Sequence, residues 1–83
     1  MSRFTIDIPQ NKKESKKPKG KTAVYGFDRV TGYFFQVIDE DNNFLINECS
    51  LFSKMPNSRM IELMQEYGAD ENHIFDVAMD LPI

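Results

Sequence analysis

The segment at residues 33–38, Tyr-Phe-Phe-Gln-Val-Ile, constrains this chain most, because it consists almost entirely of aromatic and β-branched residues. Such residues favour β-strands. Successive side chains of a strand point to opposite faces, so Tyr33, Phe35 and Val37 share one face and Phe34 and Ile38 share the other. An antiparallel sheet usually keeps one polar, solvated face. Both faces are apolar here, and we expect each of them to be covered.

Three further segments have strand patterns. Residues 3–8 alternate apolar and polar side chains, which predicts a short edge strand or a segment that orders only on a partner. Residues 22–29 alternate in the same way, and residues 44–47 are Phe-Leu-Ile-Asn. The connections at 30–32 and 39–43 contain the Gly, Asp and Asn residues of turns. These patterns together predict an antiparallel meander with short connections.

A first helix is predicted after the strands. Asn57 or Ser58 is expected to be its N-cap. Met60 and Met64 recur at helical spacing, and Gly68 stands where a left-handed residue commonly ends a helix. Methionines at this spacing are more often core residues than an adaptable binding surface. We therefore expect the methionines of the helical region to pack in the core, at positions Met55, Met60, Met64 and Met79.

A second helix is predicted from Asp70, which can cap it, to Pro82, which would stop it. Glu71 is well placed against the positive end of its dipole. The predicted fold class is α+β, with a three- to four-stranded antiparallel β-meander followed by two short α-helices packed on one face.

The 83 residues allow one domain at most. We divide the chain into a short N-terminal strand or ordering segment at 1–9, a disordered Lys-rich arm at 10–21, and a single compact acidic α+β domain at 22–83. Residues 1–21 hold seven basic residues against two acidic ones, whereas 22–83 hold three against eleven. A lysine-rich stretch without large apolar residues is typical of disorder. The acidic body should repel nucleic acid and attract basic protein surfaces.

The sequence offers little for catalysis or for binding a cofactor or metal. Cys49 and His73 are the only cysteine and histidine, and nothing in their spacing requires a catalytic pair. We interpret Cys49 as a small buried residue at a strand end and His73 as an ordinary surface histidine. The acidic run at 39–43 resembles the start of a calcium loop, but Phe44 and Ser50 occupy its glycine and glutamate positions. We expect no enzyme activity, no cofactor and no metal.

The sequence near residue 1 lacks the apolar run of a signal peptide, and no stretch approaches the length of a membrane span. We therefore expect a cytoplasmic protein that does not bind membranes.

The leading hypothesis is a non-catalytic protein-binding protein: an adaptor, an inhibitor or an accessory subunit of a larger assembly. An exposed aromatic sheet face and an acidic turn would contact the partner, and acidic helix residues would steer a basic partner. A homodimer would also cover the second apolar face. The predicted partner-binding residues are Tyr25, Arg29, Tyr33, Phe35, Asp39, Glu40, Asp41, Glu62, Glu66, Asp70 and Glu71.

The alternative hypothesis is a nucleic-acid-binding protein. Tyr25, Phe27, Tyr33 and Phe35 would form a base-stacking platform on the sheet. The arm would contact phosphates, with counterion release as the driving force. Its contact residues would be Lys12, Lys13, Lys16, Lys17, Lys19 and Lys21.

Overall fold

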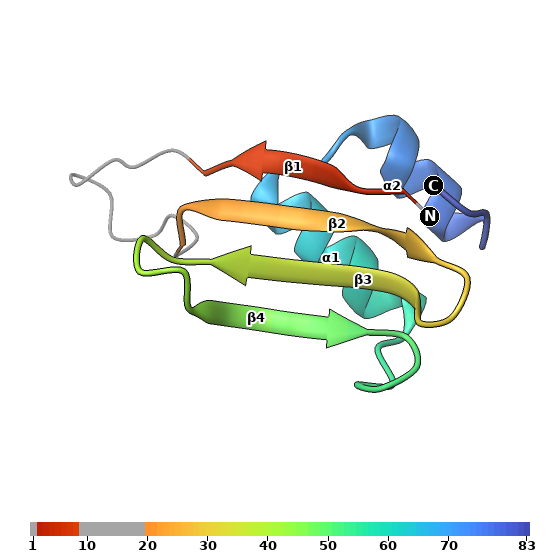
Figure 1. Cartoon of the computed structure of the whole chain (residues 1–83). Helices are drawn as coiled ribbons and strands as arrows, with labels where there is room; N and C mark the ends of the chain where they lie inside the picture. The colour runs from red at the N-terminus through yellow and green to blue at the C-terminus, as the bar shows by residue number, and fades with distance from the viewer. Residues whose placement is uncertain (1, 9–19) are drawn as a thin grey trace.

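The computed structural model describes residues 2–8 and 20–83, which form a four-stranded antiparallel sheet followed by two helices (Figure 1). The strands lie in the order β1-β2-β3-β4, and both helices lie on the same side of the sheet. The predicted α+β meander with two helices is therefore confirmed. The elements are β1 (Phe4–Asp7), β2 (Thr22–Asp28), β3 (Gly32–Ile38), β4 (Phe44–Cys49), α1 (Asn57–Tyr67) and α2 (Glu71–Ala78).

The strand register defines two rows of side chains that cross the whole sheet. One row joins Phe4, Tyr25, Phe35 and Glu48 from β1 to β4. The neighbouring row joins Thr5, Val24, Gln36 and Asn47. Since residues opposite one another on paired strands share a face, the first row belongs to one side of the sheet and the second to the other.

The turns between the strands use the residues that the sequence indicated. Gly32 ends the β2–β3 turn with a φ of 77°, a left-handed conformation that costs glycine nothing. In the β3–β4 turn, the Asp39 carboxylate accepts hydrogen bonds from the backbone N–H groups of Asp41 and Asn43, both at 2.9 Å. Asp39 is thus a structural residue of this turn.

Helix α1 begins differently from the prediction. Pro56 occupies the N-cap position without a side-chain cap, and Asn57 is the first helical residue. The Asn57 side chain instead donates to the Val77 carbonyl oxygen at 3.3 Å and to the Asp80 carboxylate at 3.0 Å, so it joins the two helical segments. The predicted end is confirmed, since Gly68 is left-handed with a φ of 79°.

Helix α2 is capped as predicted, because the Asp70 carboxylate accepts from the Asn72 N–H at 2.8 Å. The helix ends at Ala78, four residues before the proline that was expected to stop it. Within residues 2–8 and 20–83, neither helix combines the length and the apolar character needed to cross a bilayer.

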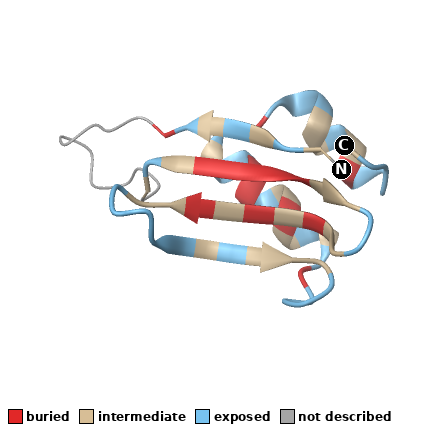
Figure 2. Ribbon diagram, viewed as in Figure 1, coloured by how far each residue is buried: buried red, intermediate tan, exposed pale blue. Residues whose placement is uncertain are grey.

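The core lies between the sheet and the helices. Its largest fully buried side chains are Phe35, Val37, Met60, Leu63, Met64 and Val77. Burial follows the middle of β2 and β3, as the red segments of Figure 2 show. The prediction of core methionines is confirmed for Met55, Met60 and Met64 and wrong for Met79, which is 58% exposed.

Candidate interaction surface

The side of the sheet that packs against the helices, here called the helix face, holds the aromatic residues that were expected to be exposed. Tyr25, Tyr33 and Phe35 are all buried, with 0% exposure for Phe35. The expectation that these residues form an exposed sheet face is therefore wrong. The sequence pattern separated the two faces of β3 correctly, but the helices cover the face that was expected to stay open.

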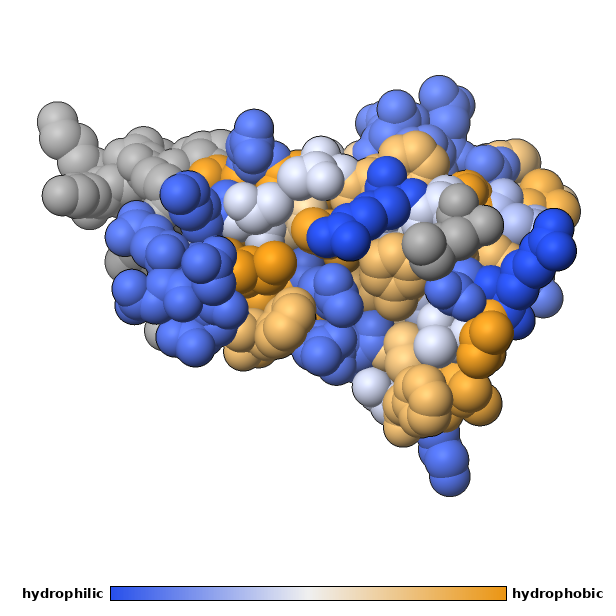
Figure 3. Space-filling model, viewed as in Figure 1, coloured by the Kyte–Doolittle hydropathy of each residue, from blue (hydrophilic) through white to orange (hydrophobic). Residues whose placement is uncertain are grey.

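The opposite side, here called the open face, is formed by the other set of strand side chains: Val24, Phe34, Gln36, Ile38, Phe44, Asn47 and Cys49. No described helix or strand lies over it, and Figure 3 shows apolar side chains interleaved with polar ones on this side. Phe34 and Ile38 are half-buried, whereas Phe44 is 55% exposed. The open face therefore presents the partly exposed side chains of Phe34, Ile38 and Phe44, which no described helix covers.

A hollow lies on the open face around Phe34. It is lined by Arg3, Asp28, Thr31, Phe34, Gln36, Asn47, Cys49 and Phe52. Next to it, the Phe34 ring covers Gly26, and the carbonyl of Ser2, which precedes β1, approaches the same glycine. A Cβ atom at position 26 would overlap that carbonyl oxygen and meet the Phe34 ring at 3.0 Å. The absence of a side chain on Gly26 thus lets Phe34 and residue 2 lie against the strand.

Sequence reasoning missed the residues that make the open face apolar, above all Phe34, Ile38 and Phe44. A signal was present in the neighbouring strands. The side of β2 that carries Gly26 and Asp28, and the side of β1 that carries Asp7, are the more polar ones. Paired residues of neighbouring strands lie on the same face of the sheet. Summing the polar residues of each face over all strands would therefore have placed the helices on the face opposite these residues.

The acidic turn lies at one end of the sheet, where Glu40 and Asp41 are exposed and Asp39 holds the turn together. Arg29 lies in the β2–β3 turn at the opposite end of β3, beside a hollow that it shares with Ser2, Phe27, Pro82 and Ile83. The structure therefore does not bring Arg29 and the acidic turn together into one site.

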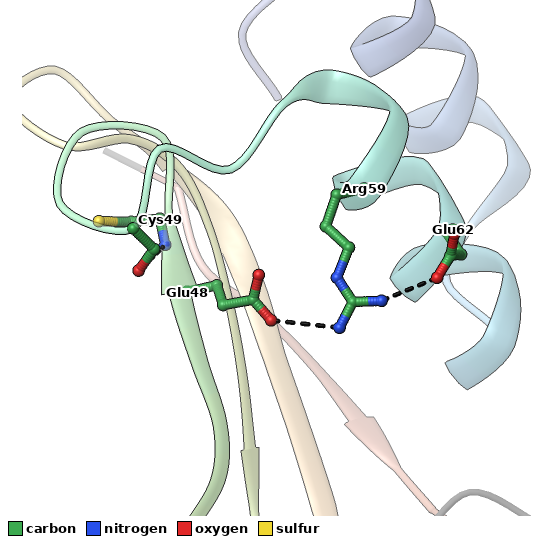
Figure 4. Close-up of polar contacts among 5 residues, drawn as sticks. Glu48, Cys49, Arg59 and Glu62 are labelled. Atoms are coloured by element: carbon green, nitrogen blue, oxygen red, sulfur yellow. Dashed lines mark hydrogen bonds and ion pairs between the residues drawn. The ribbon is translucent and has the colours of Figure 1, made fainter.

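The acidic residues of the helices lie away from the open face. Glu62 is bound to Arg59 at 2.7 Å, and Arg59 also reaches Glu48 on β4 at 3.2 Å (Figure 4). The pKa of Arg59 is raised, chiefly by its hydrogen bond to Glu48. Asp70 caps α2, whereas Glu66 and Glu71 are exposed. Of the four predicted steering acids, two thus have a structural role.

His73 is not the ordinary surface residue that was expected. Its Nδ1 lies 2.6 Å from the Tyr25 hydroxyl, and its ring packs on Phe4 with 4.1 Å between the centroids. It therefore links α2 to β1 and β2 on the helix face. Cys49 is half-buried at the end of β4, on the open face, and Figure 4 shows its sulfur pointing away from the helices. The two residues lie on opposite sides of the sheet and form no pair.

The tyrosine hydroxyls on the helix face are titratable groups in a buried setting. Burial, followed by the nearby charges of Asp80 and Asp76, raises the pKa of Tyr33. Burial also raises the pKa of Tyr25, although a hydrogen bond from the Asp70 backbone opposes this effect. Among the described residues, no group of three or more His, Cys, Asp or Glu side chains is arranged to hold a metal ion.

The residues of the nucleic-acid hypothesis divide into two sets. Lys12, Lys13, Lys16, Lys17 and Lys19 lie outside the described residues, whereas the backbone of Lys21 bonds to Ile8 and Ile38 at the sheet end. The stacking platform is not available as predicted, because Tyr25, Tyr33 and Phe35 are buried and Phe27 packs against the core.

Comparison of the chain with protein-family models, with curated proteins and with solved structures finds no match.

Proposed function

We propose that this chain is a small non-catalytic protein-binding protein, such as an adaptor, an inhibitor or an accessory subunit, and that its open face receives the partner. One observation supports this above all: in the described part of the chain both helices lie on one side of the sheet, and the other side carries Phe34, Ile38 and Phe44. Phenylalanine brings a large contact area with few rotatable bonds, which is why aromatic residues are enriched at interfaces.

Charge supports a partner with basic groups. Residues 22–83 contain eleven acidic residues against three basic ones. Asp28 lines the hollow around Phe34, and the exposed Glu40 and Asp41 lie in the turn beyond Ile38. Complementary charge at the rim of an apolar contact speeds association and selects the partner more than it adds affinity. A cytoplasmic location for this interaction stays a prediction from the sequence.

The test is a comparison of two phenylalanine variants of the full chain. Phe34→Ser changes the open face, and Phe75→Ser changes an equally large, 62% exposed side chain on α2 as a matched control. Each protein is immobilised and exposed to an extract of the native host, and captured proteins are quantified by mass spectrometry. We expect a protein that the wild type and Phe75→Ser enrich and that Phe34→Ser loses. Equal enrichment by all three would contradict the proposal, provided that urea unfolding shows a folded Phe34→Ser variant.

A second pair of variants tests the role of charge. Glu40→Gln together with Asp41→Asn removes the exposed charge of the turn and keeps Asp39, which the turn needs. We expect slower association with the captured partner and a weaker dependence of the rate on salt. Glu66→Gln with Glu71→Gln on the helices serves as the control. If only the Glu66→Gln, Glu71→Gln variant associated more slowly, the partner would contact the helix side of the molecule.

A further inference from the structure

Two connections at one end of the sheet present the two most exposed large apolar side chains among the described residues. Phe52, in the loop between β4 and α1, is 76% exposed, and Val30, in the β2–β3 turn, is 73% exposed. Leu51, beside Phe52, is also exposed. Its N–H donates to the Thr31 carbonyl oxygen at 3.0 Å, which joins the loop to the turn. Apolar side chains therefore gather at this end (Figure 3), and a continuous patch of this kind usually marks a contact site.

The loop that carries Leu51 and Phe52 is fixed by its own hydrogen bonds. The Phe52 N–H donates to Cys49 Sγ at 3.2 Å, and the Cys49 N–H donates to the Ser53 hydroxyl at 3.3 Å. Met55, later in the same loop, is buried in the core. An apolar side chain on a loop that is already ordered loses little conformational entropy when it binds. The loop is therefore suited to contact another molecule.

Both connections carry an exposed basic residue, Arg29 in the turn and Lys54 in the loop, and neither contains an acidic one. The third basic residue of the acidic body, Arg59, is already in ion pairs with two glutamates at 3.2 and 2.7 Å. Asp28, just before the turn, uses its carboxylate to accept a hydrogen bond from the Val30 N–H at 2.8 Å. This end is thus apolar with a positive rim. We call it the basic patch, formed by Arg29, Val30, Leu51, Phe52 and Lys54.

The outer side of α2 is also apolar and has the opposite charge. Phe75 is 62% exposed and Met79 is 58% exposed. They stand four residues apart, so they are neighbours on the helix surface, and the exposed Glu71 precedes them by one turn. Residues 70–81 hold four acidic residues and neither lysine nor arginine. We call this surface the α2 patch, formed by Glu71, Phe75, Asp76 and Met79.

We propose that the basic patch of one copy of this chain binds the α2 patch of another copy. Each patch has an apolar centre, Phe52 in one and Phe75 in the other, and the two rims carry opposite charge. Complementary rims favour this pairing, whereas two basic patches or two α2 patches would bring like charges together. Because two different surfaces meet, the contact is heterologous, and its repetition gives a ring or an open chain of copies.

The acidic turn at the other end of the sheet is a weaker counterpart for the basic patch. The Lys21 N–H donates to the Ile38 carbonyl oxygen at 2.8 Å, so a lysine lies next to the turn that holds Glu40 and Asp41. The segment of the α2 patch contains no such basic residue. The charge difference between the two patches therefore favours α2 over the turn.

The experiment measures the mass of the purified full chain at low salt by sedimentation equilibrium over a range of concentrations. We expect the mass of the wild type to rise with concentration above the 9.7 kDa of one chain. Phe52→Ser and Phe75→Ser each change a side chain that lies mostly in solvent. Each variant alone should have the mass of one chain. An equimolar mixture of the two should reach the mass of two chains and no more, because only one intact pair of patches remains.

Charge variants provide the control. Arg29→Gln with Lys54→Gln should weaken the association, and so should added salt, whereas Glu40→Gln with Asp41→Asn should leave it unchanged. Circular dichroism checks that every variant is folded.

Four outcomes would overturn the pairing: a single-chain mass of the wild type up to millimolar concentration, association that persists in both phenylalanine variants, a mixture that stays at the mass of one chain, or a loss of association only in the variant of the acidic turn. The measurement uses the purified chain alone, and Phe75→Ser leaves the open face intact. Its result is therefore independent of the open-face proposal.

Discussion

Phe34 and Phe35 are neighbours in β3, yet they lie on opposite faces of the sheet in different environments. Phe35 is fully buried on the helix face, between the rings of Tyr25 at 6.1 Å and Tyr67 at 5.5 Å. Phe34 lies half-buried on the open face, over a glycine and beside a hollow. The same side chain therefore contributes to stability on one face and is available for contact on the other, and only the placement of the helices decides which.

The largest expected effect separates these two residues directly. Phe35→Ala leaves a cavity that the surrounding core fills only in part, and it should lower the free energy of unfolding by about 3–5 kcal/mol. Phe34→Ala removes a side chain that already touches solvent, and its loss should be roughly 1 kcal/mol. Urea unfolding followed by circular dichroism measures both. Equal losses of stability in the two variants would mean that Phe34 and Phe35 are buried to the same extent.

Gly26→Ala tests how closely the open face is packed. The added methyl group would overlap the Ser2 carbonyl oxygen and press on Phe34. Overpacking of this kind typically costs about 1–3 kcal/mol. We expect a loss in this range, with faster hydrogen exchange in β1 because residue 2 must move. A variant as stable as the wild type would show that β1 does not rely on this contact.

Hydrogen bonds provide the next comparison. The Tyr33 hydroxyl donates to the Leu81 carbonyl oxygen at 2.7 Å on the helix face, and Gln36 donates to Asn47 at 3.3 Å on the open face. Tyr33→Phe should cost about 1 kcal/mol, since a partly buried hydrogen bond is lost. Gln36→Ala should cost no more than about half of that, because water replaces an exposed bond. The reverse order in urea unfolding would contradict this assignment.

The tyrosines of the helix face also predict a pH dependence. Burial raises the pKa of Tyr25 and of Tyr33 above the ordinary value of 10.0, so the folded state holds these protons more tightly than the unfolded state. The corresponding stability is fully present below pH 10 and is lost as pH rises through the folded-state values. Urea midpoints measured upward from pH 9 should fall above pH 10. The fall should be smaller in Tyr25→Phe with Tyr33→Phe.

The smallest effect is expected at the rim of the helix face. Arg59 joins β4 to α1 through Glu48, but its side chain is 36% exposed. Ion pairs in such a position are worth about 0–1 kcal/mol and are screened by salt. Arg59→Gln should therefore lower stability by less than 1 kcal/mol at low salt. At 1 M salt the variant and the wild type should unfold at nearly the same urea concentration.

The sequence predicted the order of the elements because their patterns are local. The alternation in β2 and β3, the left-handed Gly32 and Gly68, and the Asp70 cap depend on residues close to one another in the chain. The side on which the helices pack is not local. Two apolar faces on β3 were compatible with either side, so the predicted contact residues Tyr25, Tyr33 and Phe35 fell on the buried one.

Contacts between distant segments explain the remaining errors. Asn57 is of a residue type that often caps a helix N-terminus. Its side chain instead donates hydrogen bonds to Val77 and Asp80, 20 and 23 residues away. His73 acquires its partners only when β1 and β2 are assembled beneath α2. Such pairings depend on tertiary geometry, and no propensity or spacing in the chain specifies them.

The bonds of Tyr25 to His73 and of Tyr33 to the Leu81 carbonyl have a practical consequence for spectroscopy. The chain has three tyrosines and no tryptophan, so its near-ultraviolet fluorescence comes from the tyrosines. Two of these three rings are fixed between the sheet and the segment that contains α2 and Leu81. Their emission is a built-in, label-free signal for any displacement of that segment when a partner is added.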